Sequence, residues 1–412
     1  MSTDSRAHLV SSDVRDHNLG LVLTTVDRLG GAARAEIALE TGLARSAMSN
    51  LSAVLLESRL LRPAEEQPVA RIGRRIERLE LDGRHLAVVG AQLEVDEALV
   101  LAHDLGGRVL YREALQVRTA HGDAEAIATL IAERVTACLA DLTARSITPI
   151  SLDLVVPGMV TDGETVKYAL DLGWIGVPFR ELVASRVPAF PAGVHLGGDA
   201  PLAGYAEFTA LREEPGLAGL TNMYYLKSAT GIGGAVIMDG RLLTGSHGTL
   251  YAPGHVIVVP DGLLCACGRN GCLATVADPE VVLRNAGLSD FRDRKGLPAA
   301  LEELIRRARA GEEVASAAVT EAMRWFRMLL DNTIFLYEPE LIVLGGYLAS
   351  FVDELSRLPQ PTLEWLGCGN LRGPLAIQPA RRGAFAAVHG AITLRRLELL
   401  AAPTRCGLLA VV

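Results

Sequence analysis

The chain has 412 residues, half of them hydrophobic and 21% charged, so it is a globular protein rather than a disordered one and is long enough for two or three domains. It carries 40 Lys and Arg against 48 Asp and Glu, a net charge of −8. That average opposes a nucleic-acid partner, because phosphates require a basic surface. No apolar run reaches the length of a membrane span, and the polar N-terminus lacks the features of a signal peptide. We therefore expect a cytoplasmic protein with no membrane partner.

The first 85 residues predict three short helices followed by a hairpin. Apolar residues at three- and four-residue steps indicate helices at about 19–29, 33–40 and 44–58. Gly42 lies in the tight turn before the third helix, where a left-handed conformation suits glycine. The polar segment 63–68 and the arginine-rich run 71–78 would form a basic wing, at about residues 62–80. This order predicts a mainly α-helical, winged helix-turn-helix domain over residues 1–85.

In such a domain, the third helix enters the major groove of DNA. An arginine can bond guanine bidentately and an asparagine can do the same to adenine, whereas serines reach phosphates. The predicted DNA contacts are Arg45, Ser46, Ser49 and Asn50 on the helix and Arg71, Arg74 and Arg75 on the wing. Helix spacing alone also fits a small helical dimerisation module with a solvated run of charges. The order of helices, turn, polar helix and basic hairpin favours DNA binding.

The distribution of charge along the chain changes the meaning of its average. Residues 1–85 contain twelve arginines and twelve acids, so this segment is neutral and the whole of the −8 belongs to residues 86–412. Within the neutral segment, the wing is locally positive. We expect modest phosphate affinity per subunit, which dimerisation would increase.

From Leu86 onward the pattern changes to short strands. Strands are predicted at 86–92, 98–104 and 108–117, a helix at 124–145 and a buried strand at 151–156. This β-β-β-α-β order is the half-domain of a ribonuclease H-like fold, the architecture of actin-type kinases. A second strand-rich stretch begins at Asn222, a long helical stretch covers about 299–337, and a strand at 341–346 runs into a glycine turn. The last helix, about 386–400, would return to the first lobe.

Three of the six cysteines lie within eight positions, in the segment 265–272 (Cys-Ala-Cys-Gly-Arg-Asn-Gly-Cys). This crowding indicates a metal site in a reducing compartment rather than a disulfide framework. With His255, the thiolates of Cys265, Cys267 and Cys272 supply four ligands, enough to close a tetrahedron around Zn²⁺. A closed shell leaves no position for water, so the zinc would be structural. The alternative is three unrelated thiols.

The chain resembles the ROK family, which comprises bacterial sugar kinases and sugar-responsive repressors that share one kinase-like fold. The resemblance covers nearly the whole chain, and an N-terminal winged helix marks the repressor branch. The motifs that carry it are 156–160 (Val-Pro-Gly-Met-Val), 172–174 (Leu-Gly-Trp), 198–200 (Gly-Asp-Ala), 230–234 (Thr-Gly-Ile-Gly-Gly), the His255 and cysteine motif, and 339–346 (Pro-Glu-Leu-Ile-Val-Leu-Gly-Gly). Gly73-Arg74-Arg75 matches the glycine-arginine pair that usually ends the wing in that branch.

The family's phosphate loop, Asp-x-Gly-Gly-Thr-Lys, is replaced here by residues 92–97, Gln-Leu-Glu-Val-Asp-Glu. The glycines that let the backbone approach phosphate are absent, and Glu94, Asp96 and Glu97 would place three carboxylates near ATP oxygens. Like charges at contact distance repel by about 1 kcal/mol even when well solvated. We therefore expect no ATP cofactor and no catalytic residue. Asp199 falls where the resemblance implies the catalytic base, and here it could at most accept hydrogen bonds from a ligand.

The resemblance also implies a sugar pocket, from which this chain departs. Two glutamate positions of the family are occupied by Ala252 and Ala274, and the asparagine before Asp199 is replaced by Gly198. Each lost hydrogen bond to a charged acceptor is worth about 1.5–3 kcal/mol, so ordinary sugar affinity would be lost. We expect a pocket that is empty or adapted to a less polar ligand. Its predicted contacts are Asp199, His255, Gly158 and Gly198, and segments with Tyr168, Trp174, His247 and Tyr251 could line it.

We expect a non-catalytic transcriptional regulator that acts as a repressor. It would associate with the nucleoid when bound to operator DNA. Its partners would be operator DNA, a second copy in a homodimer or homotetramer, and a small-molecule effector, either a sugar or another metabolite. A ROK-type sugar kinase that phosphorylates hexoses with ATP is the alternative. The expected domains are the winged helix (1–85), a first lobe (86–205 with 386–412) and a second lobe (206–385) with the zinc site.

Overall fold

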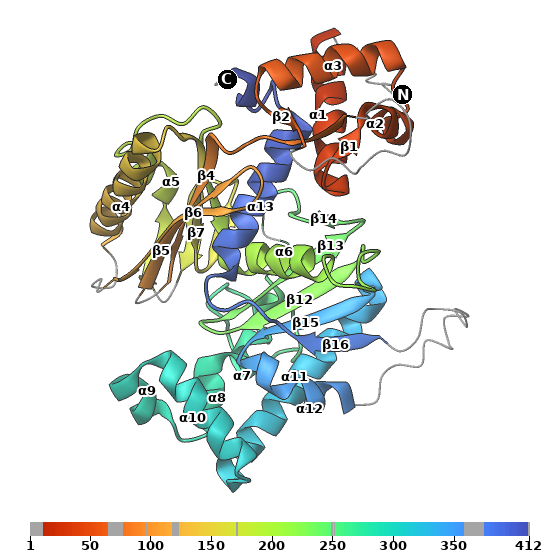
Figure 1. The fold of residues 1–412 in the computed structure, drawn as a ribbon. Helices are drawn as coiled ribbons and strands as arrows, with labels where there is room; N and C mark the ends of the chain where they lie inside the picture. Colours follow the sequence, from red (N-terminus) through yellow and green to blue (C-terminus); the bar gives the residue numbers. More distant parts are fainter. Residues whose placement is uncertain are drawn as a thin grey trace, which may run out of the picture.

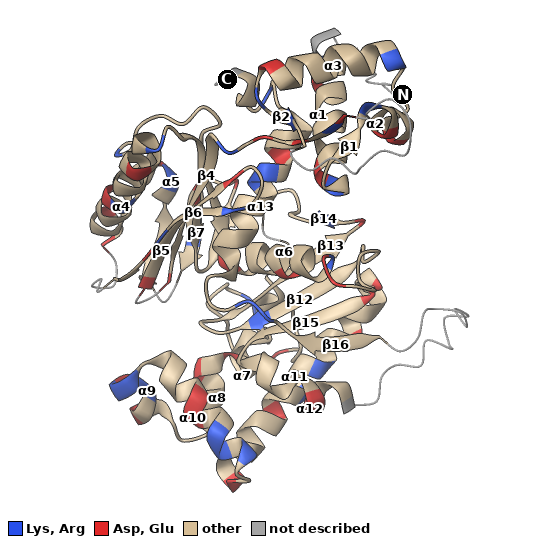
Figure 2. Ribbon diagram, in the orientation of Figure 1, with Lys and Arg blue, Asp and Glu red and all other residues tan. Residues whose placement is uncertain are grey.

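The computed structural model describes residues 11–64, 77–94, 97–117, 123–169, 172–248, 250, 252–357 and 375–410. A small helical domain at the N-terminus sits on one end of a larger body built from two five-stranded sheets (Figure 1). Charged residues gather on the peripheral helices, whereas strands β12 (Met223–Ser228), β15 (Leu341–Gly346) and β16 (Ala376–Pro379) are nearly free of them (Figure 2). Among the described residues, no helix is both long and apolar enough to cross a membrane.

The N-terminal domain has three helices, α1 (Ser11–Leu29), α2 (Arg34–Thr41) and α3 (Arg45–Glu57), within a few residues of the predicted bounds except that α1 begins earlier. Gly42 follows α2 with φ 70°, the left-handed conformation that the sequence required. Strands β2 (Leu61–Pro63) and β3 (Arg78–Leu81) pair antiparallel, and β1 (Ala32–Ala33) joins the other edge of β3. The domain is therefore a winged helix, although the tip of the wing, residues 65–76, lies outside the described residues.

The first lobe contains a sheet with the strand order β11-β7-β4-β5-β6. Its strands are β4 (Leu86–Leu93), β5 (Glu97–Asp104), β6 (Val109–Gln116), β7 (Thr148–Val156) and β11 (Val194–Gly198). Alternate residues of β4 join two different cores, with Val89 packed in the core of helix α4 (Ala124–Ala144) and Val88 in the core on the opposite face. A strand that is buried on both faces has a continuous run of apolar residues in its sequence, and residues 86–93 show this pattern.

A small antiparallel sheet extends this lobe beyond β7. It has the strand order β10-β9-β8, with β8 at Met159–Thr161, β9 at Thr165–Ala169 and β10 at Trp174–Val177. Helix α5 (Phe179–Ala184) follows, and Phe179 packs against Trp174 with ring centroids 4.8 Å apart. Trp174, expected in a segment near the pocket, is thus a core residue with 1% of its surface exposed.

The second lobe is built on a sheet with the strand order β14-β13-β12-β15-β16. Strands β13 (Ile232–Met238) and β14 (Arg241–Leu242) form its antiparallel edge, while β15 runs parallel to β12 and β16. The outer face packs against helices α7 (Ala274–Ala277), α8 (Pro279–Asn285), α10 (Leu297–Arg309) and α11 (Glu313–Tyr337). The single helical stretch expected at 299–337 is two helices, because Gly311 adopts φ 76° between α10 and α11.

Two helices join the lobes to each other and to the winged helix. Helix α6 (Asp199–Leu211) packs against both α13 (Ala386–Ala401) and the inner face of β12 and β13. Helix α13 lies on the first sheet and runs from the middle of the body to α1 (Figure 1). One continuous apolar core therefore includes residues of the winged helix, α6, α13 and both sheets. The lobe boundary expected after residue 205 falls inside α6, whose buried residues serve both lobes.

Polar contacts fix the winged helix onto α13. Arg396 forms a bidentate ion pair with Asp27 of α1, and Asp16 accepts a hydrogen bond from the backbone N–H of Thr404 at 2.6 Å. Gly20 permits the close approach of the two helices, because a Cβ at this position would lie 2.0 Å from the carbonyl oxygen of Ala401. The orientation of the winged helix is thus set by packing against the last helix of the chain.

Candidate functional site

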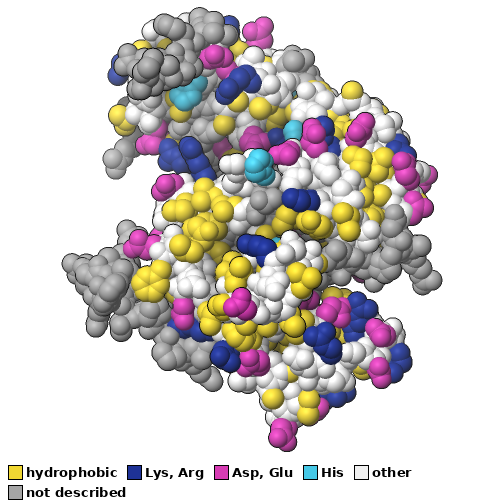
Figure 3. All heavy atoms as spheres, turned by 180° about the vertical axis from the view of Figure 1, so that it is seen from behind, with side chains coloured by type: hydrophobic (Ala, Val, Ile, Leu, Met, Phe, Trp, Pro, Cys, Tyr) yellow, Lys and Arg dark blue, Asp and Glu magenta, His cyan; other side chains and the backbone are white. Residues whose placement is uncertain are grey.

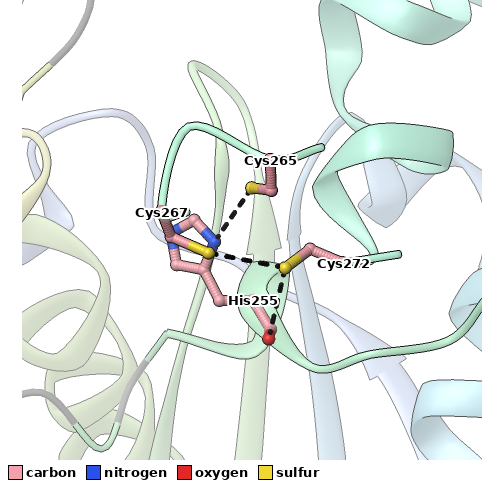
Figure 4. A group of neighbouring side chains, drawn as sticks. All are labelled: His255, Cys265, Cys267 and Cys272. Carbon is pink, nitrogen blue, oxygen red and sulfur yellow. Dashed lines mark hydrogen bonds between the residues drawn. The ribbon is translucent and has the colours of Figure 1, made fainter. Parts of the chain in front are cut away.

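Four side chains with metal-binding atoms meet beside the second sheet. His255 ends a short 3-10 helix, η2 (Pro253–His255), and the three cysteines come from the loop that precedes α7. The ligand atoms of His255, Cys265, Cys267 and Cys272 all lie within 4.8 Å of one another (Figure 4). The Sγ of Cys265 lies 3.5 Å from the Nδ1 of His255, and the Sγ atoms of Cys267 and Cys272 are 3.5 Å apart. The structure thus brings together all four residues that the sequence predicted as ligands.

The loop adopts this shape because of short-range contacts in its backbone. The backbone N–H of Cys265 donates to the carbonyl of Arg269 at 2.8 Å, which closes a tight turn around the first two cysteines. Gly271 has φ 75°, and a Cβ there would lie 1.7 Å from the carbonyl oxygen of Val259. The guanidinium of Arg269 donates to the carbonyl of His255 at 2.6 Å and so ties the cysteine loop to η2.

Three sulfur ligands and one imidazole form the ligand set of a structural zinc site. Burial opposes ionisation of the Cys267 thiol, but hydrogen bonds from the backbone and guanidinium of Arg269 outweigh it and lower its pKa to about 7. A metal binds the thiolate rather than the thiol, so the lowered pKa of Cys267 favours coordination, whereas burial and the neighbouring sulfurs raise the pKa of the Cys272 thiol to about 12. The cluster can hold a metal ion, and the chemistry of its four ligands fits Zn²⁺.

A cavity of about 220 Å³ lies next to this cluster, between the two lobes. Its walls come from the segment before β8, from β9, from the start of α6, from β12 with the glycine loop 229–233, and from the metal loop. On the face seen in Figure 3, hydrophobic side chains gather over the middle of the body around a hollow. Gly158 has φ 106°, and a Cβ there would lie 2.1 Å from the carbonyl of Tyr168, so only glycine allows this wall to close.

Several residues expected at a ligand pocket do line this cavity. They are Gly158, Tyr168, Asp199, Ala252, His255 and Ala274. Gly198 directly precedes Asp199 as the N-cap of α6 but is not part of the wall. His247 is exposed, and its Nδ1 lies 3.9 Å from the Oδ1 of Asp162. Tyr251 lies outside the described residues. The two alanines at the former glutamate positions make that side of the cavity apolar.

Sequence reasoning missed the cation in the wall of the cavity, Lys227 of β12. Its Nζ lies 2.5 Å from the Oδ2 of Asp199, and both side chains are nearly buried. Burial alone would lower the pKa of Lys227, but the carboxylates of Asp199 and Glu94 raise it well above its usual range. Asp199, expected to be available to a ligand, is thus held by a charged lysine. The signal in the sequence was the identity of the residue, because only three of the 40 basic residues are lysines.

The acidic segment at 92–97 is divided by the fold. Glu94 follows β4, and its carboxyl interacts electrostatically with Lys227 and Asp199. Glu97 begins β5, and its exposed side chain accepts a hydrogen bond from Gln116 at 2.9 Å. Asp96 lies outside the described residues. Of the three carboxylates expected around ATP oxygens, the structure therefore directs Glu94 toward the cleft and Glu97 toward the neighbouring strand. Burial is the main reason that the pKa of Glu94 is raised to about 7.

The predicted DNA-reading residues lie on the outer face of the winged helix. Arg45, Ser46, Ser49 and Asn50 are all exposed on α3, while Met48, Leu51 and Leu55 of the same helix are buried against the core. Asn50 also borders a shallow groove between α3 and α1, together with Arg15 and Asn18. The predicted wing residues Arg71, Arg74 and Arg75 lie outside the described residues.

Sequence comparison with known proteins finds a matching family and several relatives of the chain. The model of the ROK family matches residues 89–397. Kanosamine kinase of Amycolatopsis mediterranei is 29% identical over 60% of this chain and 77% of that protein, and glucokinase of Streptomyces coelicolor is 30% identical over 56% and 75%. The DNA-binding transcriptional dual regulator NagC of Escherichia coli is 24% identical, but the match covers 88% of both chains. The regulator match therefore covers a larger share of this chain than the kinase matches do.

Comparison with solved structures finds the same fold in a regulator and in a kinase of the family. A crystal structure of a ROK family transcriptional regulator, a homologue of the E. coli MLC protein, superposes with a TM-score of 0.73 over 97% of this chain and 98% of that chain, at 20% identity. A ROK family glucokinase from Streptomyces griseus, solved with glucose and AMPPNP, has a TM-score of 0.55 over 75% of this chain, at 24% identity. The body has the two-lobed, actin-like ATPase fold, and the winged helix precedes it, which confirms the predicted fold class.

Proposed function

Because the chain belongs to the ROK family, we propose that it is a DNA-binding transcriptional regulator of that family, acting as a repressor, without phosphotransferase activity. The observation that carries this proposal is the three-helix domain with its described wing strands, docked on α13 with the polar face of α3 exposed. The likeness to NagC over 88% of both chains supports it. In this function α3 enters the major groove, Arg45 and Asn50 contact bases, and the wing arginines at 71, 74 and 75 contact phosphates.

The body would serve as the sensor and as the dimerisation unit. A dimer provides two reading helices for two half-sites, which compensates for the neutral charge of each winged helix. The four-residue cluster would hold a structural Zn²⁺ that fixes the loop forming one wall of the cavity. The protein would act in the cytoplasm, and a ligand bound between the lobes would change the relative orientation of the two winged helices.

The alternative is a sugar kinase, which the kanosamine kinase and glucokinase relatives favour. Phosphoryl transfer depends on neutralising phosphate charge and on a free base for the sugar hydroxyl. Here the carboxylate of Asp199 is paired with Lys227, and Glu94 places a further carboxyl, rather than a cation, at the same end of the cleft. These contacts support the non-catalytic proposal.

DNA binding can be tested by selecting fragments of genomic DNA with the purified full-length protein and measuring the affinity of the recovered sites. Arg45→Ala and Asn50→Ala should reduce discrimination between the selected and random sequences, since each bidentate base contact is worth about 1–3 kcal/mol. Glu57→Ala, an exposed change at the far end of the same helix, should leave discrimination intact. Failure to enrich any sequence would refute the regulator function.

The kinase alternative is tested separately, by incubating the protein with labelled ATP and a panel of hexoses. We expect no transfer of phosphate. Transfer to any hexose above the level of an Asp199→Asn control would overturn the non-catalytic proposal, whatever the outcome with DNA.

A further inference from the structure

A shallow groove lies between α1 and α3 on the surface of the winged helix. Helix α1 contributes Val14, Arg15 and Asn18 to its lining, and α3 contributes Ala47, Asn50 and Leu51. Positions three and four residues apart lie on one face of a helix, so each helix presents a single face to the groove. Because Asn50 is also one of the predicted base contacts, the groove opens directly beside the side chains that would read DNA.

Ion pairs within the protein occupy most of the arginines of this domain. Of the eight arginines within residues 11–64 and 77–85, five are paired with carboxylates, namely Arg28, Arg34, Arg62, Arg78 and Arg84. Arg15, Arg45 and Arg59 are exposed and form no ion pair with another described residue. A paired arginine must give up its carboxylate to bind a phosphate, so the charge available to DNA in these segments belongs to the three unpaired side chains.

Arg15 lies at the end of the winged helix that points away from the body. Figure 1 shows α3 across the outer end of α1, whereas Asp27, near the other end of α1, pairs with α13. Arg59 instead follows the last turn of α3 and acts electrostatically on His85, at the junction with the first lobe. Of the unpaired arginines, Arg15 is thus the one that α1 holds beside the exposed face of α3.

The acidic residues of the two helices lie away from the groove. Asp13 is two positions before Arg15, which places it about 200° around the helix axis. Asp16 is buried and paired with Arg405 of the C-terminal segment. On α3, Glu57 occupies the last position of the helix, far from the groove residues near its start. Arg15 is therefore the one charged side chain among the described residues that line the groove.

The lining of the groove matches the two chemical parts of a nucleic-acid backbone. The guanidinium of Arg15 can bind a phosphate through two parallel N–H donors, and the amides of Asn18 and Asn50 can each add a donor. Neither amide forms a side-chain hydrogen bond with another described residue. Val14, with 43% of its surface exposed, and Ala47 offer apolar surface on which a deoxyribose can pack. An anionic chain of sugars and phosphates therefore fits this lining.

We propose that the groove between α1 and α3 holds one strand of the DNA backbone, with the guanidinium of Arg15 on a phosphate and Asn18 beside it. This inference rests on the proposed regulatory function and extends the DNA interface from α3 onto α1. The phosphate bound by Arg15 flanks the bases that Asn50 contacts. Arg15 thus fixes the position of α3 in the major groove without itself reading sequence.

The test measures the affinity of the full-length protein for its selected DNA and for random DNA over a range of salt concentrations. Arg15→Ala should weaken binding to both by about three- to tenfold at about 50 mM salt. It should also reduce the slope of log affinity against log salt by about 0.9, the contribution of one phosphate, so that its defect is about 3.5-fold smaller at about 200 mM. Arg15→Lys keeps the charge and should retain the slope.

Arg28→Ala is the matched control, because it removes the same charge from the other end of α1, where Arg28 pairs with Glu40. It should leave the slope unchanged. Ethylation interference then identifies the contact: an ethylated phosphate that blocks wild type should no longer affect Arg15→Ala. The melting temperature of Arg15→Ala should equal that of wild type, since the side chain is exposed and unpaired among the described residues.

The outcomes separate this inference from the regulatory function on which it rests. If wild type binds no DNA at all, both are overturned. If wild type binds DNA, the inference alone is overturned by an unchanged slope in Arg15→Ala, by an equal loss in Arg28→Ala, or by a loss confined to the selected sequence. A groove occupied by a peptide or by a second copy of the chain would give the first of these results.

Discussion

Replacement of Glu94 by glutamine tests whether this carboxyl is held in a costly buried position. Burial raises the pKa of Glu94 to about 7 from an ordinary value of 4.5, and the nearby Asp199 and Glu97 act in the same direction. Lys227 and the amide of Gln92 oppose this shift without cancelling it. The folded state therefore binds a proton that the unfolded chain releases between about pH 4.5 and 7.

The sign of the effect follows from this difference in proton binding. A group whose pKa is higher in the folded state contributes stability that is present below the unfolded pKa and is lost as the pH rises through the folded pKa. For Glu94, that loss amounts to about 2–3 kcal/mol between pH 5 and pH 8. Glutamine has the same shape, cannot ionise and can still accept a hydrogen bond from Gln92, so Glu94→Gln should remove this loss.

The assay is urea denaturation of wild type and Glu94→Gln at several pH values. The difference between their free energies of unfolding reports on this one carboxyl, because all other groups are the same in both proteins. The variant should gain stability relative to wild type as the pH rises from 5 to 8, with about half of the gain reached near pH 6 and most of it by pH 7. A difference for Glu94→Gln that stays flat across this range would refute the buried, raised carboxyl.

Three further predictions concern the metal cluster and the docking of the winged helix. Cys267→Ser should release bound metal, measured by elemental analysis, and lower the melting temperature, whereas Cys406→Ser, outside the cluster, should do neither. Gly20→Ala should destabilise the protein by about 1–3 kcal/mol because its Cβ would meet the backbone of α13, while Gly219→Ala, with open space around it, should not. Asp27→Asn and Arg396→Gln, combined in a double-mutant cycle, should show a coupling of about 1–3 kcal/mol, and additive effects would contradict the bidentate pair.

Periodicity in the sequence was sufficient for most of the fold. The apolar spacing predicted the helices of the winged helix and the succession of strands and helix along the chain from residue 86 to 156, because amphipathic patterns reflect which face of each element is buried. The strand at 341–346 was predicted with its observed bounds. The small sheet of β8, β9 and β10 was not predicted as strands, since its segments are short and only partly buried.

The four residues of the Cys and His cluster could also be predicted to lie together, because they fall within 18 residues of the sequence and one loop brings them together. The same holds for the exposed face of α3, where helical spacing alone decides which side chains point away from the core. Information of this kind is local, so the sequence by itself is enough for it.

The pairing of charged side chains in the cleft could be seen only in the tertiary structure. Lys227 and Asp199 are 28 positions apart on different lobes, and nothing in their local sequence indicates that they pair. The direction of Glu94 and the docking of α1 on α13 depend likewise on how sheets and helices pack over long separations. The sequence therefore determined the elements, the family and the residues of the Cys and His cluster, whereas the charges that meet in the cleft were decided only when packing brought the two lobes together.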